Sequence, residues 1–300
     1  MIDYSYLSLQ NPWWRSASAI EEDDKIKEFE GLKFQYRPTQ ILDAVLQTGD
    51  IILITGPRQT GKSTGLKLLI RKLIREERNP HSLFYFNCDA LSSEKDVIDV
   101  IVQFQESGEY EKTVIFLDEI SSIPNWPQGI KWLADAGLTK NTTLFLTGSS
   151  SINLKKSGEF LPGRRGRGKD IHFLPLSFSE YLALHNIRTD PIGAVTVKKL
   201  AELSSIRHAV QKQYKVFLST GGFLRNINYG ITETGNDLYL KTLKSELYKA
   251  GKKEDNLREV VRKILASLSS QTSYTNIAEE AELGSKNTSI DYLNFLADSF

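Results

Sequence analysis

A glycine-rich stretch, Gly56–Ser63, has the residue types and spacing of a phosphate-binding loop. Its sequence fits the pattern G-x-x-x-x-G-K-[ST], and it lies between an apolar run, Ile51–Thr55, and an amphipathic helical stretch. The glycines let the backbone N–H groups turn towards phosphate oxygens, and the following helix adds its positive end. We expect Lys62 to reach the β and γ phosphates and Ser63 to bind magnesium. The residues predicted to hold the nucleotide are Gly56, Pro57, Arg58, Gln59, Thr60, Gly61, Lys62, Ser63 and Thr64. The alternative is a glycine-rich turn without a ligand.

Two adjacent acids, Asp118 and Glu119, follow a second apolar run, Thr113–Leu117. In a parallel sheet these carboxylates would lie at the same edge as the loop Gly56–Ser63. Asp118 suits the magnesium shell, and Glu119 suits a general base that deprotonates the attacking water. The alternative is that the pair only begins a solvated loop.

A third run, Thr142–Thr147, ends in hydroxyl side chains and is expected to lie between the strand that precedes the loop and the strand that ends at Asp118. A hydroxyl there could hold the attacking water or sense the γ phosphate. Thr147 and Ser149 are the candidates, and we prefer Ser149 as the catalytic residue. The alternative is that these hydroxyls cap a helix.

Arginines at two places could neutralise phosphate charge. Arg164, Arg165 and Arg167 lie among glycines, and we interpret this loop as the source of an arginine finger that neutralises charge on the γ phosphate, often from a neighbouring subunit. A solvated loop and a contact to the nucleic-acid backbone are the second and third interpretations. Arg225 follows Gly221-Gly222 and could reach the nucleotide from a lid, or form a surface salt bridge.

Composition excludes several classes of protein. A formal net charge of +1 gives no global field that favours nucleic acid or membrane. A single cysteine, Cys88, excludes an intramolecular disulfide, and the four histidines lack metal-ligand spacing. Neither a membrane-spanning run nor a secretory signal is present, so we expect a cytoplasmic protein.

The elements that position these residues alternate between strand and helix over residues 51–183. This alternation predicts a doubly wound α/β fold of the P-loop type with a parallel sheet. The predicted strands are Ile51–Thr55, Ser82–Asn87, Thr113–Asp118, Thr142–Thr147 and Asp170–Leu174. The predicted helices of this part are Thr39–Gln47, Lys62–Glu76, Glu94–Phe104 and Ile130–Ala136. Residues 1–50 form an N-terminal arm, in which Trp13 and Trp14 are expected to anchor the arm on the core.

The remaining residues have helical periodicity. We assign residues 184–252 to a helical lid and residues 253–300 to a winged-helix-like segment. Tyr274–Ala281, a turn at Gly284 and Asn287–Leu296 have helix-turn-helix spacing. The expected recognition helix offers Lys286 and Asn287 but also an acid, and the helix before it carries three glutamates. We therefore favour a regulatory or protein-docking segment, with DNA binding as the second option.

The chain resembles archaeal and bacterial ATPases related to AAA+ and STAND proteins, which carry C-terminal winged helices. The matching pieces are Asn11–Trp14, Gly56–Ser63, Phe116–Ile120, Asn125-Trp126, Thr147–Ser150, Leu161–Gly166, Pro175–Phe178 with Glu180, and Gly221–Phe223. The resemblance implies an ATPase core, a lid and a winged helix, and it supports ATP as the nucleotide. It also implies that Arg164 is the finger-type arginine of the loop. Members usually continue into a further domain, so we expect the winged helix at Phe300 to be incomplete.

These observations predict magnesium-dependent ATP hydrolysis, coupled to a partner protein or DNA and carried out by a homo-oligomer if Arg164 acts between subunits. A nucleotide-dependent switch with little hydrolysis is the main alternative. A small-molecule kinase is disfavoured by the acidic pair and the helical tail.

Overall fold

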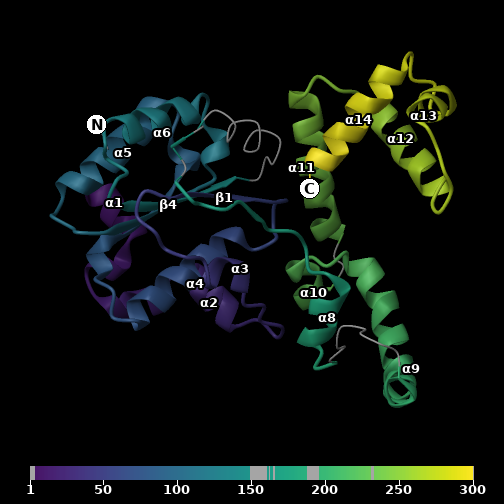
Figure 1. Cartoon of the computed structure of the whole chain (residues 1–300), viewed down its shortest axis with the longest axis horizontal. Helices are drawn as coiled ribbons and strands as arrows, with labels where there is room; N and C mark the ends of the chain where they lie inside the picture. Colours follow the sequence, from purple (N-terminus) through teal and green to yellow (C-terminus); the bar gives the residue numbers. More distant parts are fainter. Residues whose placement is uncertain are drawn as a thin grey trace.

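The computed structural model describes residues 4–148, 161, 163, 164, 166–187, 196–230 and 233–299. A parallel sheet of five strands in the order β2-β3-β4-β1-β5 forms the centre of the first half of the chain (Figure 1). The strands are β1 (Ile51–Thr55), β2 (Leu83–Asn87), β3 (Thr113–Asp118), β4 (Thr142–Gly148) and β5 (Ile171–His172). The predicted parallel α/β fold is confirmed, and β4 lies between β1 and β3 as expected.

Helices cover both faces of the sheet, which is why β1, β3 and β4 are buried along their whole length. Figure 1 shows α5 and α6 on one side and α4, α2 and α3 on the other. These helices are α4 (Lys62–Arg75), α5 (Glu94–Glu106), α6 (Trp126–Asp135), α2 (Asp24–Glu30) and α3 (Thr39–Leu42). Short 3₁₀ turns join several elements: η3 (Pro80–Ser82), η4 (Cys88–Ala90) and η5 (Ile120–Ser122).

Three of the predicted elements, α6, α3 and β5, have clearly different bounds in the structure. Helix α6 begins at Trp126, four positions earlier than the predicted Ile130, because Pro127 lies in its first turn, where a missing N–H costs no hydrogen bond. Helix α3 ends at Leu42 rather than Gln47, and β5 contains only Ile171 and His172 of the predicted Asp170–Leu174. The register explains β5, since only these two residues pair with β1.

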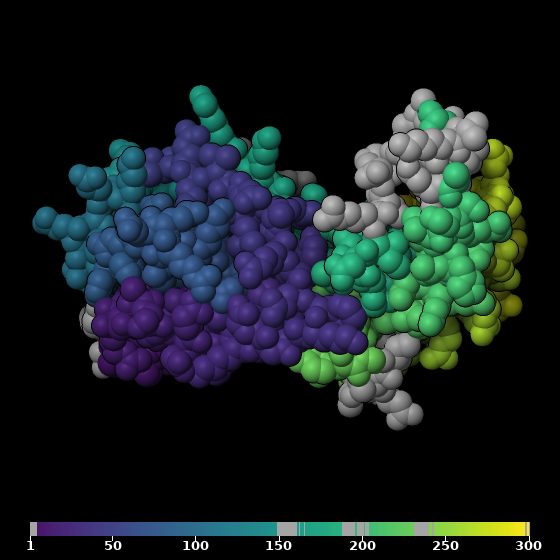
Figure 2. Space-filling model, turned by 90° about the horizontal axis from the view of Figure 1, so that it is seen from below, coloured from purple at the N-terminus to yellow at the C-terminus, as the bar shows by residue number. Residues whose placement is uncertain are grey.

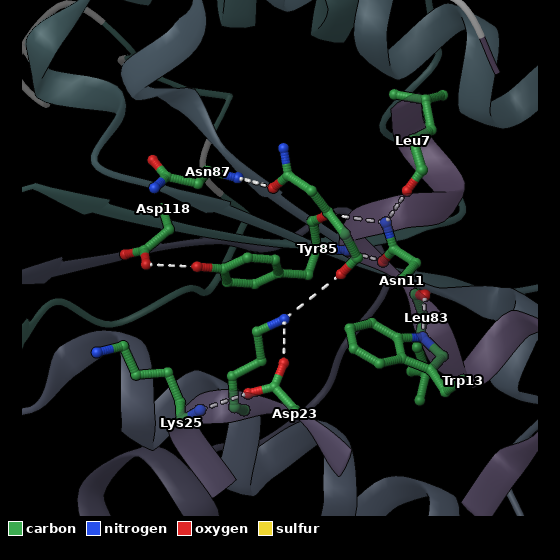
Figure 3. Close-up of polar contacts among 11 residues, drawn as sticks. Leu7, Asn11, Trp13, Asp23, Lys25, Leu83, Tyr85, Asn87 and Asp118 are labelled. Atoms are coloured by element: carbon green, nitrogen blue, oxygen red, sulfur yellow. Dashed lines mark hydrogen bonds and ion pairs between the residues drawn. The ribbon is translucent and has the colours of Figure 1, made fainter. Parts of the chain in front are cut away.

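The N-terminal arm completes the edge of the sheet. It contains α1 (Tyr4–Gln10), η1 (Pro12–Trp14) and η2 (Ala17–Glu22), followed by α2 and α3. Asn11 donates from Nδ2 to the carbonyl oxygen of Tyr85 at 2.9 Å and accepts the Tyr85 N–H at 2.7 Å, as a neighbouring strand would (Figure 3). The indole nitrogens of Trp13 and Trp14 both donate to the carbonyl oxygen of Leu83, at 2.9 and 3.0 Å. The predicted anchoring role of the two tryptophans is therefore confirmed, and the arm satisfies backbone groups that an edge strand leaves open.

The second half of the chain is helical. Its helices are α8 (Phe178–Leu184), α9 (Val197–Thr220), α10 (Leu224–Tyr229), α11 (Glu233–Lys249), α12 (Glu254–Ala266), α13 (Tyr274–Glu280) and α14 (Lys286–Asp298). The end of α11 and helices α12–α14 share a small apolar cluster that contains Leu247, Val260 and Phe295. Residues 253–299 contain helices and no strand that could form a wing, so the winged helix stays a prediction. The domain boundaries also stay predictions. In the part of the chain that the structure describes, every helix is too short or too polar to cross a membrane.

Candidate nucleotide-binding site

The loop after β1 has a backbone that only glycine can adopt at two positions. Gly56 has φ 151°, and a Cβ there would lie 2.0 Å from the carbonyl oxygen of Phe173. Gly61 has φ 101° and immediately precedes α4. The two glycines thus let the chain turn from β1 into α4, whose N-terminus carries the partial positive charge of its unpaired N–H groups.

Lys62 is held inside this loop. Its ammonium group donates to the carbonyl oxygens of Gly56 and Pro57 at 2.8 and 2.9 Å, and the residue is 4% exposed. Burial lowers the pKa of Lys62, while the nearby carboxylates of Glu119 and Asp118 raise it. The structure therefore brings the predicted lysine and the predicted acids into one electrostatic environment.

Asp118 is buried at the end of β3 and is held by two hydroxyl groups. Its Oδ2 accepts from the Tyr85 hydroxyl at 2.8 Å, and its Oδ1 accepts from the Thr147 hydroxyl. Thr147 also accepts the backbone N–H of Glu119 at 3.0 Å. Glu119 has φ 56°, so the chain turns sharply directly after the strand. One threonine thus links both predicted acids.

Of the two hydroxyl candidates, Thr147 of β4 lies at this junction, whereas Ser149 lies outside the described residues. The preference for Ser149 stays a prediction. Thr147 could be identified from its place at a strand end next to the strand of Asp118 in the predicted sheet.

A cavity of about 300 Å³ lies beside the loop. From the core, it is lined by Lys62, Ser63 and Glu119 together with Gln59, Gly61 and Thr64. From the helical half, Leu224, Arg225 and Tyr229 line it, so Arg225 lies where a lid arginine is predicted to lie. Most of the remaining lining residues are apolar or aromatic, and many come from the N-terminal arm, which also contributes two charged residues. They are Lys25, Glu28, Phe29, Leu32, Tyr36, Pro38, Gly65, Leu68 and Phe173.

Sequence reasoning missed this contribution of the arm. The signal was present in the segment Phe34–Pro38, which carries two aromatic residues shortly before β1. The segment contacts helices α8 and α10 directly. The Tyr36 hydroxyl donates to Glu180 at 2.7 Å, and the Asn228 side chain bonds both backbone groups of Phe34, at 2.8 and 3.1 Å. Figure 2 shows the N-terminal segment, in purple and blue, in contact with the green helices of the second half.

Arg164 lies outside the residues that line this cavity. It forms a two-point ion pair with Asp135 at the end of α6, with N–O distances of 2.6 and 3.2 Å. Hydrogen bonding to Arg164 lowers the pKa of Asp135, and the same bond raises the pKa of Arg164. The finger role of Arg164 stays a prediction, and Arg165 lies outside the described residues.

The described residues contain no cluster of three or more His, Cys, Asp or Glu side chains that could hold a metal by themselves. A magnesium ion that also binds phosphate oxygens needs only one or two protein oxygens. Ser63 lines the cavity, and Asp118 is a buried carboxylate close enough to Lys62 to shift its pKa. These residues fit magnesium that arrives with a nucleotide.

Comparison with known protein families agrees with this geometry. Residues 48–182 match the family model of an AAA domain. Residues 48–182 form an AAA domain. This AAA domain includes the P-loop, both acids and all five strands, and such domains bind nucleotides at the carboxyl ends of their strands.

Two relatives are similar over part of this chain. An uncharacterized protein of Methanocaldococcus jannaschii, MJ1544, is 30% identical over 177 residues, which are 58% of this chain and 35% of that protein. An uncharacterized protein of Haemophilus influenzae is 29% identical over 144 residues, which are 47% of this chain and 35% of that protein. The matched regions thus span about a third of both relatives.

Two solved structures are similar over most of the chain. The Walker-type ATPase of Pyrococcus abyssi is 15% identical, with 94% of this chain and 89% of that chain covered and a TM-score of 0.48. The ORC2 protein of Aeropyrum pernix, in ADPNP and ADP complexes, is 14% identical, with 92% and 86% covered and a TM-score of 0.46. At this level of similarity neither structure assigns a partner or a reaction to this chain.

Proposed function

We propose that this chain binds ATP in the cavity beside Gly56–Ser63 and hydrolyses it to ADP and phosphate. The observation that carries the proposal is that Lys62, Ser63 and Glu119 line one cavity with Arg225 of the helical half. A cavity with cationic groups and loop N–H groups on one side suits the phosphates. Its apolar and aromatic side, with Leu32, suits a nucleoside base.

Each residue has a defined task in this proposal. The loop N–H groups and Lys62 bind the phosphates. Glu119 takes a proton from the attacking water while the oxygen of that water bonds to the γ phosphorus. The bond from the γ phosphorus to the bridging oxygen breaks, and ADP leaves with that oxygen. Magnesium, held by Ser63 and Asp118, supplies positive charge to the phosphate oxygens when bound. Thr147 fixes the spacing between Asp118 and Glu119, since it bonds to both.

The substitution Glu119→Gln tests the assignment. It keeps the size of the side chain and removes the base, so ATP binding should persist while phosphate release falls about a hundredfold or more. Phosphate release and ATP affinity should be measured on the same preparation, with Glu28→Gln, at the rim of the cavity, as the matched control. Full turnover by Glu119→Gln would reject the role of Glu119. Tight ATP binding without turnover in the unaltered protein would instead support a nucleotide-dependent switch.

We assign the coupling partner to the C-terminal helices, with a protein favoured over DNA. The exposed residues of α14 combine Lys286 and Asn287 with Asp291, and Asp291 pairs with Lys252. Glu279 and Glu280 of α13 are exposed and would repel phosphate. A gel shift that weakens steeply with salt would contradict this preference and indicate DNA.

The finger role of Arg164 requires an oligomer. Arg164→Ala should lose turnover and recover it when mixed with Glu119→Gln subunits, because each would supply what the other lacks. Absence of recovery, with oligomerisation intact by light scattering, would remove this assignment.

A further inference from the structure

Tyr85 connects the N-terminal arm to the acid at the end of β3. Its hydroxyl lies 2.8 Å from Asp118 Oδ2, and Figure 3 shows its ring extended from β2 towards that carboxylate. Asn87 is the register partner of Asp118, and Tyr85 lies two positions earlier on the same face of β2. The contact is buried, since Tyr85 is 7% and Asp118 2% exposed.

Tyr85 is fixed from three directions. Asn11 holds its backbone by the two hydrogen bonds at the sheet edge. The Lys67 ammonium group lies 3.6 Å from the centre of its ring, within the range of a cation–π interaction. Lys67 is in turn paired with Asp23 of the arm at 3.1 Å, and its side chain is only 5% exposed.

Lys67 belongs to α4, the same helix that begins with Lys62. Burial lowers the pKa of Lys67, while its ion pair with Asp23 and, to a smaller extent, the charge of the Asp118 carboxylate raise it. Asp118 accepts one hydroxyl hydrogen bond on each carboxylate oxygen, from Tyr85 and from Thr147. These two bonds restrict rotation of the carboxylate.

We propose that Tyr85 is a positioning residue for the magnesium ion that accompanies the nucleotide, because its hydroxyl fixes the orientation of Asp118. The inference rests on the proposed function, since it assigns Asp118 to the metal. Groups that hydrogen-bond to a metal ligand orient it, and their loss typically weakens metal affinity about 10- to 100-fold. The N-terminal arm contributes through Asn11 and Asp23, although neither touches the nucleotide cavity.

The test is a titration of Mg²⁺ into the protein with a fixed amount of a fluorescent ADP analogue. Tyr85→Phe removes the hydroxyl and keeps the ring in place over Lys67. We expect the Mg²⁺ concentration that gives half of the fluorescence change to rise about tenfold or more. Affinity for the analogue in EDTA should stay within about twofold, because the phosphate-binding groups of the loop are unchanged. Mn²⁺ binding, measured by electron paramagnetic resonance with ADP present, should weaken in parallel.

The matched control is Tyr292→Phe, which removes another buried hydroxyl, in the C-terminal cluster, whose oxygen accepts the backbone N–H of Lys253 at 2.8 Å. It should leave the Mg²⁺ midpoint unchanged. Lys67→Met is the second variant, because it keeps the hydroxyl and removes the cation, and it should shift the midpoint in the same direction by less. An unchanged Mg²⁺ midpoint in both Tyr85→Phe and Lys67→Met would overturn the role of Tyr85 and leave the proposed ATP binding untouched. A wild-type protein that takes up nucleotide without any response to Mg²⁺ would overturn the inference together with the assignment of Asp118 to the metal.

Discussion

The AAA domain and the C-terminal helices bury their apolar residues in different ways. The sheet, its helices and the N-terminal arm share one apolar cluster that extends from Leu7 to Phe173. The C-terminal cluster is much smaller, and many large apolar side chains around it are exposed. They include Leu240, Tyr248, Leu265, Leu268 and Tyr274. The first region can hold a fixed site, whereas the second is suited to movement and docking.

The contacts between the sheet-containing half with its arm and the helices from α8 onward include hydrogen bonds and the ring contact of Phe34 with His185. Tyr36 bonds to Glu180, Asn228 bonds to the backbone of Phe34, and the N–H of Leu176 donates to Gly222 at 2.9 Å. Because the nucleotide cavity is lined from both regions, we expect its occupation to strengthen their association.

The largest effect is expected from the arm. Trp13→Ala removes a side chain that is 1% exposed and bonded to the sheet edge, so it should lower the free energy of unfolding by about 3–5 kcal/mol. Urea denaturation, monitored by circular dichroism, measures this free energy of unfolding. Trp132→Ala is the matched control, because this tryptophan is 52% exposed and should change stability by less than about 1 kcal/mol. Equal losses in the two variants would show that the arm is not part of the core.

An intermediate effect is expected at the contact between the arm and the lid. Asn228→Ala removes both hydrogen bonds to Phe34, each with a net value of about 1 kcal/mol, so ATP affinity should fall by up to roughly thirtyfold. The melting temperature of the core should change little. Calorimetric titration with ATP measures the affinity, with Asn294→Ala on the exposed surface of α14 as the control. Unchanged affinity in Asn228→Ala would mean that this contact does not hold the lid over the cavity.

The smallest effect is expected from pH. Burial, with a lesser contribution from Lys33, lowers the pKa of His185, whose ring lies 4.5 Å from that of Phe34. The unfolded chain then binds more protons than the folded one at mildly acidic pH. The contribution of His185 to stability is therefore complete above its ordinary pKa of 6.5 and is lost as the pH falls below it. His185→Phe keeps the ring contacts without a charge, so its melting temperature should fall less than that of the wild type between pH 7.5 and 5.5. His208→Gln on the exposed part of α9 should behave like the wild type, and an identical fall in His185→Phe would exclude His185 as the cause.

Local sequence patterns were sufficient to predict the strands of the sheet and the phosphate-binding loop. Gly56–Ser63 is one continuous motif, and Asp118 follows an apolar run that the register places beside β4. The contacts of Tyr85 were not predictable in this way, because its partners Asp118 and Asn11 lie 33 and 74 positions away. They depend on the strand order and on the path of the arm, which periodicity does not encode.

The most direct test of the central claim is calorimetric titration of Mg-ATP into the folded wild-type protein and into Lys62→Ala. Lys62 donates to two loop carbonyls and lines the cavity, so its ammonium group is the main cation available to the phosphates there. We expect one ATP per chain in the wild type and at least about a hundredfold weaker uptake in Lys62→Ala. No uptake by the wild type, or equal uptake by both, would contradict the assignment of this cavity to ATP.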